Sequence, residues 1–373
     1  MKTASFLLSL TLIFSSSVFT QPEPSPGPNL PSLDVKIGQM LNVGFRGLSI
    51  ENNSHILRDL REYHLGSVVL FDYDVPSQNP VRNVESADQL HKLVSGLKKH
   101  AVEPLLVMID QEGGRVSRLK PRFGFPSSVS AQYLGTVDHS DTTRHYASLT
   151  ARTLSELGIN VNLAPVVDLN LNPDNPVIGT LERSFSSDPA TVTRHARSFI
   201  EAHHKFDILT TLKHFPGHGS SREDSHYGMV DVTETWSEQE LLPYRNLLES
   251  GHIDMVMTAH IVNENWDPRY PATLSEKVLT QILRQEIGFN GVIISDDMQM
   301  EAIRSQYGLE TAVKLAIKAG VDILSFANNS IYDPDIIPKA HAIIKKFVED
   351  GVISEDRIHD SYERIMNLKN LQF

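Results

Sequence analysis

The 373-residue chain contains no cysteine, which excludes disulfide bonds, thiol nucleophiles and metal sites built on cysteine. It is also poor in clustered positive charge. The formal net charge is −12, and basic runs do not exceed pairs such as Lys98–Lys99 and Lys345–Lys346. Binding to a phosphate backbone depends on concentrated lysine and arginine, so a nucleic-acid partner is not expected. With 40% hydrophobic and 21% charged residues, the composition is that of a soluble globular protein.

Two common functional motifs are missing as well. Neither the glycines after Glu112 nor the segment 216–219 has the glycine spacing and the following Lys-Ser/Thr of a phosphate-binding loop. No Gly-x-Ser-x-Gly nucleophile elbow occurs. The chemistry of this chain must therefore come from its histidines, carboxylates and basic side chains.

The first residues differ in composition from the remainder of the chain. Lys2 is followed by an apolar run at 6–14 and then by small and polar residues, which is the layout of a secretory signal peptide over residues 1–20. The run is short for a bilayer span, although an uncleaved N-terminal anchor is the alternative. Residues 21–32 are rich in proline and predict an extended linker. We expect export to a periplasm or the medium, with no membrane span after cleavage of the signal.

From Leu33 onward, apolar runs alternate with helical patterns. Eight near-continuous apolar runs predict buried parallel strands, at Met40–Phe45, Gly66–Phe71, Pro104–Ile109, Asn160–Val167, Ile208–Lys213, Met255–Ala259, Val292–Ser295 and Asp322–Phe326. Helical patterns lie between them, at Ala87–Lys99, His145–Leu157, Ala190–His203, Glu238–Ser250, Ser275–Glu286, Met300–Ala319 and Asp335–Glu349. The alternation predicts an α/β fold, a (β/α)8 TIM-type barrel forming a single domain over 33–373. A doubly wound open sheet is the alternative.

The stretch from Thr211 to His226 carries the densest chemistry. An apolar run ends in Lys213 and His214, and Pro216, Gly217 and Gly219 then interrupt regular structure. The segment continues to Asp-Ser-His at 224–226. Loops at strand ends are where a rigid scaffold presents reactive groups. We therefore predict that this stretch forms the centre of an active site.

Ionisable residues also follow four other predicted strands, which end near Asp110, Asp168, His260 and Asp296. In a barrel the carboxyl ends of all strands meet at one rim, so these groups are expected to lie near Lys213 and His214. Several of their neighbours have structural explanations. They are Asp297 as a hydrogen-bond anchor, His218 as a loop-shaping residue, His260 as a core histidine and Asp110–Arg115 as an ion pair of the rim.

Two mechanisms fit these residues. One is metal-assisted hydrolysis, with His214, His218, His226 and His260 as ligands alongside a carboxylate. Against it, the His-Phe-Pro-Gly-His run turns sharply and lacks the i, i+4 helical spacing that presents two ligands on one face. We accordingly expect that neither a metal nor another cofactor is used.

The other mechanism pairs a carboxylate nucleophile with a separate proton carrier. Asp296 follows the buried run 292–295, which would hold its carboxylate at the rim to attack an anomeric carbon. His226 can protonate the leaving oxygen if it is charged. The nearby Asp224 would favour the charged form and fix the ring tautomer.

These residues resemble a known family. Lys-His-Phe-Pro-Gly-His-Gly at 213–219 with Asp-Ser-His at 224–226 is similar to the signature of family 3 glycoside hydrolases in their β-N-acetylglucosaminidase branch. Ser-Asp-Asp-Met at 295–298 resembles the family's nucleophile segment, and residues 110–118 resemble its substrate-binding loop. A fourth block, 175–185, matches too, so the resemblance runs in order from Leu33 to about Leu368.

The resemblance implies a retaining exo-β-N-acetylglucosaminidase (β-N-acetylhexosaminidase). It implies Asp296 as nucleophile and an Asp224–His226 acid/base dyad. The residues that it implies hold the sugar are Asp110, Arg118, Arg183, Lys213 and His214.

The expected partner is a glycan that contains N-acetylglucosamine. The export signal points to cell-wall muropeptides, chitin fragments or glycoconjugates outside the cytoplasm. A phosphorylase of the same fold stays open, because a histidine repels incoming phosphate less than a second carboxylate does. A non-catalytic sugar-binding protein is the other alternative, and nothing in the residues indicates an oligomeric state.

Overall fold

The computed structural model describes residues 31–51 and 54–371. The predicted signal peptide at 1–20, and the predicted linker at 21–32 except for its last two residues, lie outside this described part. Over the described residues, no helix combines the length and the apolar character needed to cross a membrane.

Eight parallel strands form the central sheet. They are β1 (Leu41–Gly44), β2 (Ser67–Leu70), β3 (Leu106–Ile109), β4 (Val161–Asn162), β5 (Leu209–Phe215), β7 (Met255–Thr258), β9 (Val292–Ile294) and β10 (Leu324–Phe326). The sheet runs in the order β10-β1-β2-β3-β4-β5-β7-β9, and a parallel bridge between Ile294 and Ile323 joins its two ends. The sheet thus curls into a nearly closed barrel. This confirms the TIM-type prediction and shows that the open doubly wound alternative was wrong.

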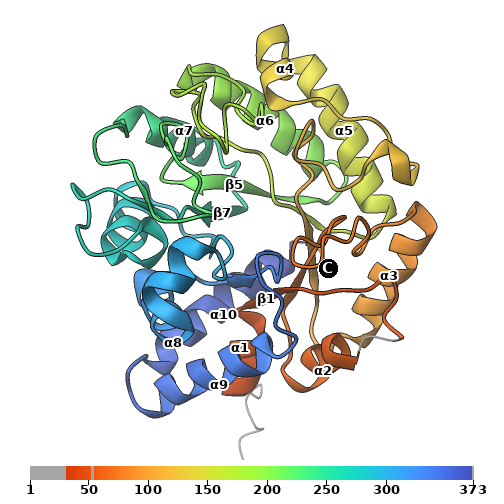
Figure 1. Cartoon of the computed structure of the whole chain (residues 1–373), viewed down its shortest axis with the longest axis vertical. Coiled ribbons are helices and arrows are strands. Elements are labelled where there is room, and N and C mark those ends of the chain that lie inside the picture. The colour runs from red at the N-terminus through yellow and green to blue at the C-terminus, as the bar shows by residue number, and fades with distance from the viewer. Residues whose placement is uncertain (1–30, 52–53, 372–373) are drawn as a thin grey trace, which may run out of the picture. The chain divides into compact units, whose positions relative to one another are not determined.

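Helices surround the barrel, and Figure 1 shows them around the strands β1, β5 and β7. The α-helices are α1 (Leu33–Gln39), α2 (Ser54–Glu62), α3 (Ala87–His100), α4 (Ala131–Val137), α5 (Ser140–Glu156), α6 (Pro189–His204), α7 (Leu242–Glu249), α8 (Glu301–Ala319), α9 (Ile336–Glu349) and α10 (Glu355–Lys369). Shorter or tighter segments complete them, namely the 3-10 turns η1 (Pro121–Phe123), η2 (Glu238–Leu241) and η3 (Ala272–Leu274) and the π-helix η4 (Lys277–Glu286).

Local sequence explains where these helices start and what they bury. Helix α3 begins after Ser86, whose hydroxyl accepts from the backbone N–H of Gln89, and buries an apolar stripe at i, i+3, i+4 and i+7, from Leu90 to Leu97. Asp188 caps α6 in the same way, with Pro189 at the first helical position. The strands are buried on both faces because helices cover the outside of the barrel and side chains fill the inside.

Several expected boundaries were wrong. The predicted strand Asn160–Val167 forms a ladder only at β4, because Pro165 has no N–H to donate, and the chain returns to the sheet at a bridge between Val166 and Lys213. Helices α1, α2, α4 and α10 were not predicted. Within the predicted helix 275–286, residues Lys277–Glu286 form the π-helix η4. The predicted helix 238–250 starts with the 3-10 turn η2.

Helix α10 packs at the amino ends of strands β2 and β3, opposite their carboxyl ends. The ammonium group of Lys369, in α10, donates to the carbonyls of Gly66 and Pro104 and to the side chain of Gln39, at 2.9, 2.6 and 2.5 Å. These acceptors precede β2 and β3 and end α1. A single buried side chain thus fastens the last helix to three earlier elements.

Candidate active site

Strand β5 supplies the residues at the centre of the site. Lys213, the last residue of the predicted strand, and His214, expected just beyond it, both lie within β5, so their backbone is fixed by the sheet. The Lys213 side chain is 2% exposed, and its ammonium lies 2.7 Å from an oxygen of Asp110 and 2.7 Å from one of Glu112. A buried cation needs such partners, because an unpaired charge is costly away from water.

Arg183 completes this ion network through Glu112. Its Nε and Nη2 atoms donate to the two oxygens of Glu112, both at 2.8 Å, in a bidentate pair. Burial alone would raise the pKa of Glu112, but Arg183 and Lys213 lower it to about 2. Glu112 was not assigned a role from the sequence. The signal that could have found it was its place between Asp110 and Arg118 in the substrate-binding segment.

Asp168 is the second residue whose role the sequence did not reveal. Its fully buried carboxylate accepts from the His214 ring at Nδ1 (2.7 Å), and from the backbone N–H groups of His214 and His218. The other ring nitrogen of His214, Nε2, lies 3.2 Å from Nη2 of Arg183. Because arginine can only donate, Nε2 accepts and Nδ1 carries the proton. Asp168 therefore fixes both the ring orientation and the tautomer of His214.

Arg118 lies at the edge of the network. It is 3.3 Å from Asp110, so the ion pair of Asp110 involves Arg118 and Lys213, and not Arg115 as the structural alternative had it. The side-chain oxygen of Gln111 accepts from the backbone N–H groups of Arg118 and Leu119, which holds this loop in place.

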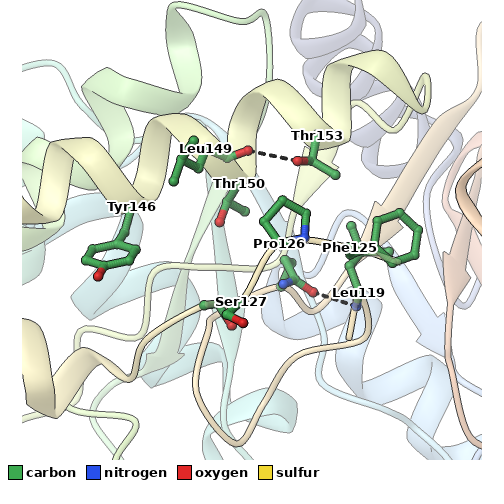
Figure 2. Close-up of a pocket in the computed structure, with 10 residues that line it drawn as sticks. Leu119, Phe125, Pro126, Ser127, Tyr146, Leu149, Thr150 and Thr153 are labelled. Carbon is green, nitrogen blue, oxygen red and sulfur yellow. Dashed lines mark hydrogen bonds between the residues drawn. The ribbon is translucent and has the colours of Figure 1, made fainter. Parts of the chain in front are cut away.

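The same loop also lies against α5, as Figure 2 shows for residues 125–127 beneath Tyr146, Leu149 and Thr150. The cavity between loop and helix holds about 20 Å³, which is room for one water molecule and for no sugar ring. This pocket lies beneath the loop that holds Gln111 and Leu119 and is separate from the ion network.

Asp296 lies just beyond the carboxyl end of β9, separated from it by Ser295, so the strand ends one residue earlier than predicted. Its carboxylate accepts from the backbone N–H of Asp297 at 2.8 Å. Burial would raise the pKa of Asp296, but the histidines around it, His260, His214 and His226 in that order, hold it below its ordinary value. Asp296 is therefore ionised at neutral pH, as a nucleophile must be.

Asp297 and His260 have structural contacts. Asp297 accepts from the backbone N–H groups of Gln299 and Ala327, both at 3.0 Å, which matches its expected role as an anchor. Burial raises the pKa of Asp297 to about 6. His260 is fully buried between the hydroxyl of Thr273 (2.8 Å) and the carbonyl of Asp297 (3.0 Å).

The predicted dyad forms on the loop after β5. Nδ1 of His226 lies 2.7 Å from Oδ1 of Asp224, which also accepts from the His226 backbone N–H at 2.9 Å. This hydrogen bond to Asp224 raises the pKa of His226, and the Asp296 carboxylate raises it further. The His226 side chain is 54% exposed. With Nδ1 bonded to Asp224, Nε2 of His226 has no partner within residues 31–51 and 54–371 and is available to carry a proton.

Three of the four histidines of the metal hypothesis have their ring nitrogens engaged by protein groups. Both ring nitrogens of His214 and of His260 already have protein partners, and His218 is buried against the hydroxyls of Ser221 and Ser225. In the described part of the chain, no group of three histidine or carboxylate side chains is arranged to hold a metal ion.

The fold of this chain recurs in known proteins. The model of the glycosyl hydrolase family 3 N-terminal domain matches residues 32–368. The chain belongs to glycoside hydrolase family 3. A β-hexosaminidase of Tolumonas auensis is 36% identical over 72% of this chain and 78% of its own length. The β-N-acetylhexosaminidase structure from Beutenbergia cavernae is 28% identical, with a TM-score of 0.82, over 92% of this chain and 100% of that one.

Other relatives are longer than this family 3 chain. β-Hexosaminidase A of Pseudoalteromonas piscicida is 33% identical over 83% of this chain. The chain spans only 54% of that protein. The family 3 β-N-acetylglucosaminidase structure from Paenibacillus sp. str. FPU-7 is 33% identical, with a TM-score of 0.84. The match covers 92% of this chain and 63% of that one. Single-barrel and longer relatives thus share the fold described here.

Proposed function

We propose that this family 3 member is a retaining exo-β-N-acetylglucosaminidase that removes terminal β-linked N-acetylglucosamine. The observation that carries the proposal is the pairing of an ionised Asp296 with an Asp224–His226 dyad whose second ring nitrogen is free. The electrostatic coupling of Asp296 with His226 supports their action on one bond. The names of the relatives, β-hexosaminidases and β-N-acetylglucosaminidases, supply the substrate class.

The residues suggest a two-step displacement. In the first step a carboxylate oxygen of Asp296 bonds to the anomeric carbon, while Nε2–H of His226 protonates the departing glycosidic oxygen. In the second step His226 takes a proton from water, whose oxygen bonds to the anomeric carbon as the bond to Asp296 breaks. Asp224 supports both steps, because its hydrogen bond stabilises the charged imidazole and fixes Nδ1–H.

The ion network provides the sugar-binding part of this proposal. Asp110 accepts hydrogen bonds from hydroxyl groups, while Arg118, Arg183 and Lys213 donate. His214 lies against Arg183 and owes its fixed orientation to Asp168. Opposite charges held in fixed positions at a buried wall can align sugar hydroxyls with little reorganisation.

We also propose a place of action outside the cytoplasm. The support for this location is the composition of residues 1–20 alone, which lie outside the described structure. The substrates proposed for this location are peptidoglycan or chitin fragments and glycoconjugates.

The proposal is tested by covalent trapping. The enzyme is incubated with a 5-fluoro N-acetylglucosaminyl fluoride, and the modified peptide is located by mass spectrometry. We expect the label on Asp296, release of the β-anomer first when turnover is followed by NMR, and no effect of a chelator. A label elsewhere, or first release of the α-anomer, would contradict the mechanism, and inhibition by the chelator would revive the metal mechanism. Any turnover excludes a purely sugar-binding role.

Phosphorolysis is the second candidate, and the exposed histidine dyad favours it. A cationic His226, 54% exposed, attracts phosphate where a second carboxylate would repel it. Turnover is measured with and without inorganic phosphate, and the products are examined for N-acetylglucosamine 1-phosphate. Hydrolysis predicts the free sugar at a rate independent of phosphate.

A further inference from the structure

The loop that carries the dyad rests on Glu240, a buried residue of η2 that is 1% exposed. The backbone N–H of Gly219 donates to Oε2 of Glu240 at 3.0 Å. Gly217 packs on the same side chain with a φ of +119°, and a Cβ added there would lie 2.5 Å from Cβ of Glu240. The loop thus contacts Glu240 so closely that only glycine fits.

Further contacts continue from this base toward the dyad. On the opposite side, Asp168 accepts from the backbone N–H of His218. The His218 ring then lies 2.7 Å from the hydroxyl of Ser221 and 3.5 Å from that of Ser225, the residue between Asp224 and His226. A shift at Gly219 is therefore passed to the dyad through a short, fully buried chain of contacts.

We propose that Glu240 is a positioning residue for proton transfer, anchoring the loop so that the Asp224–His226 dyad is held over the glycosidic oxygen. It touches neither sugar nor reacting atoms in this scheme. The inference deepens the proposed function and rests on it for its kinetic part. Its structural part, the anchoring of the loop, can be measured without any substrate.

The chemistry around Glu240 favours a neutral carboxyl group. The titratable groups that face it are Asp168, from the loop after β4, and Tyr244, from α7. On the loop itself, burial lowers the pKa of His218 to about 4, so this histidine brings no charge at neutral pH. Burial, helped by the charge of Asp168, raises the pKa of Glu240 to about 8. A glutamine, neutral and of equal shape, can therefore replace Glu240.

The kinetic test compares Glu240→Ala and Glu240→Gln with Glu238→Ala, an exposed residue on the same turn. For Glu240→Ala we expect kcat/KM to fall by about ten- to a hundredfold on an N-acetylglucosamine disaccharide, whose leaving group needs protonation. On an aryl glycoside with a good leaving group it should fall by less than about threefold. Glu240→Gln and Glu238→Ala should stay near the wild type. Equal losses on both substrates, or none, would overturn the proposal.

The substrate-free test measures hydrogen exchange in peptides covering 216–228. We expect exchange at least about tenfold faster in Glu240→Ala and unchanged in Glu240→Gln and Glu238→Ala. Unchanged exchange in Glu240→Ala refutes the anchoring even if the wild type is inactive, whereas wild-type inactivity refutes the proposed function alone. If Glu240→Ala does not fold, Glu240→Asp replaces it, because it withdraws the carboxyl from Gly219 by one methylene.

Discussion

At the scale of single residues, Asp296 and Asp297 are neighbours with different tasks. Within the described residues, the only hydrogen bond of the Asp296 carboxylate is with the backbone N–H next to it, so it holds no other loop in place. Asp297 instead holds two backbone N–H groups of other loops. We predict that Asp296→Ala lowers kcat/KM by about 10⁴-fold or more and leaves the melting temperature unchanged. Asp297→Ala should cost about 1–3 kcal/mol of unfolding free energy, measured in urea. Equal loss of stability in both variants would contradict this division.

His226 is tested by the leaving group of the substrate. His226→Ala should lower kcat/KM by about 10²- to 10⁴-fold for a disaccharide, and far less for an activated aryl glycoside, because only the first needs a proton. Equal losses on both substrates would count against the acid role.

The active form needs Asp296 ionised and His226 protonated. Activity should therefore rise with pH below the ordinary aspartate value and fall above 6.5, since the pKa of Asp296 is lowered and that of His226 raised. The alkaline fall should disappear in His226→Ala.

At the scale of elements, the sequence was most informative for features that depend on the residues of a single element. Continuous apolar runs identified all eight barrel strands, and Asp296 was found because it directly follows such a run. Glu112 and Asp168 were missed because their partners, Arg183, Lys213 and His214, lie on other elements, and sequence spacing does not reveal such contacts. Helix α10 was missed for a related reason, since its anchoring residue Lys369 reads as a surface charge until its three buried acceptors are known.

Helix α10 supplies the prediction at this scale. Lys369→Met keeps the length of the side chain but leaves the carbonyls of Gly66 and Pro104 without this donor. We expect a loss of about 2–4 kcal/mol in the free energy of unfolding in urea. Activity of the folded fraction should be unchanged, because the contact is at the opposite end of the barrel from the site. The exposed Lys346→Met serves as the control, and an equal effect there would argue that Lys369 is not an anchor.

At the scale of the whole molecule, one barrel brings together every residue that the proposed mechanism uses. Strands β3, β5 and β9 and the loops that follow them supply the nucleophile, the dyad and most of the ion network. We predict that residues 32–373, expressed without the first 31, fold with the same melting temperature and kcat/KM as the 373-residue chain. A drop in either quantity would assign a role in folding or activity to residues 1–31.

Acid sensitivity of the whole fold follows from the ion network at its centre. Arg183 and Lys213 hold the pKa of Glu112 near 2, below its ordinary value of 4.5. A depressed carboxylate pKa stabilises the folded state above the ordinary value, and this stability is lost as the pH falls toward the folded pKa. We expect the free energy of unfolding of the protein to fall by about 3 kcal/mol between pH 4.5 and about 2 as Glu112 is protonated. Glu112→Gln should be less stable at neutral pH, because two buried cations lose a carboxylate, but should lack this component of the acid slope. Urea unfolding of both proteins across that pH range measures the difference, and parallel slopes would show that Glu112 is not the group responsible.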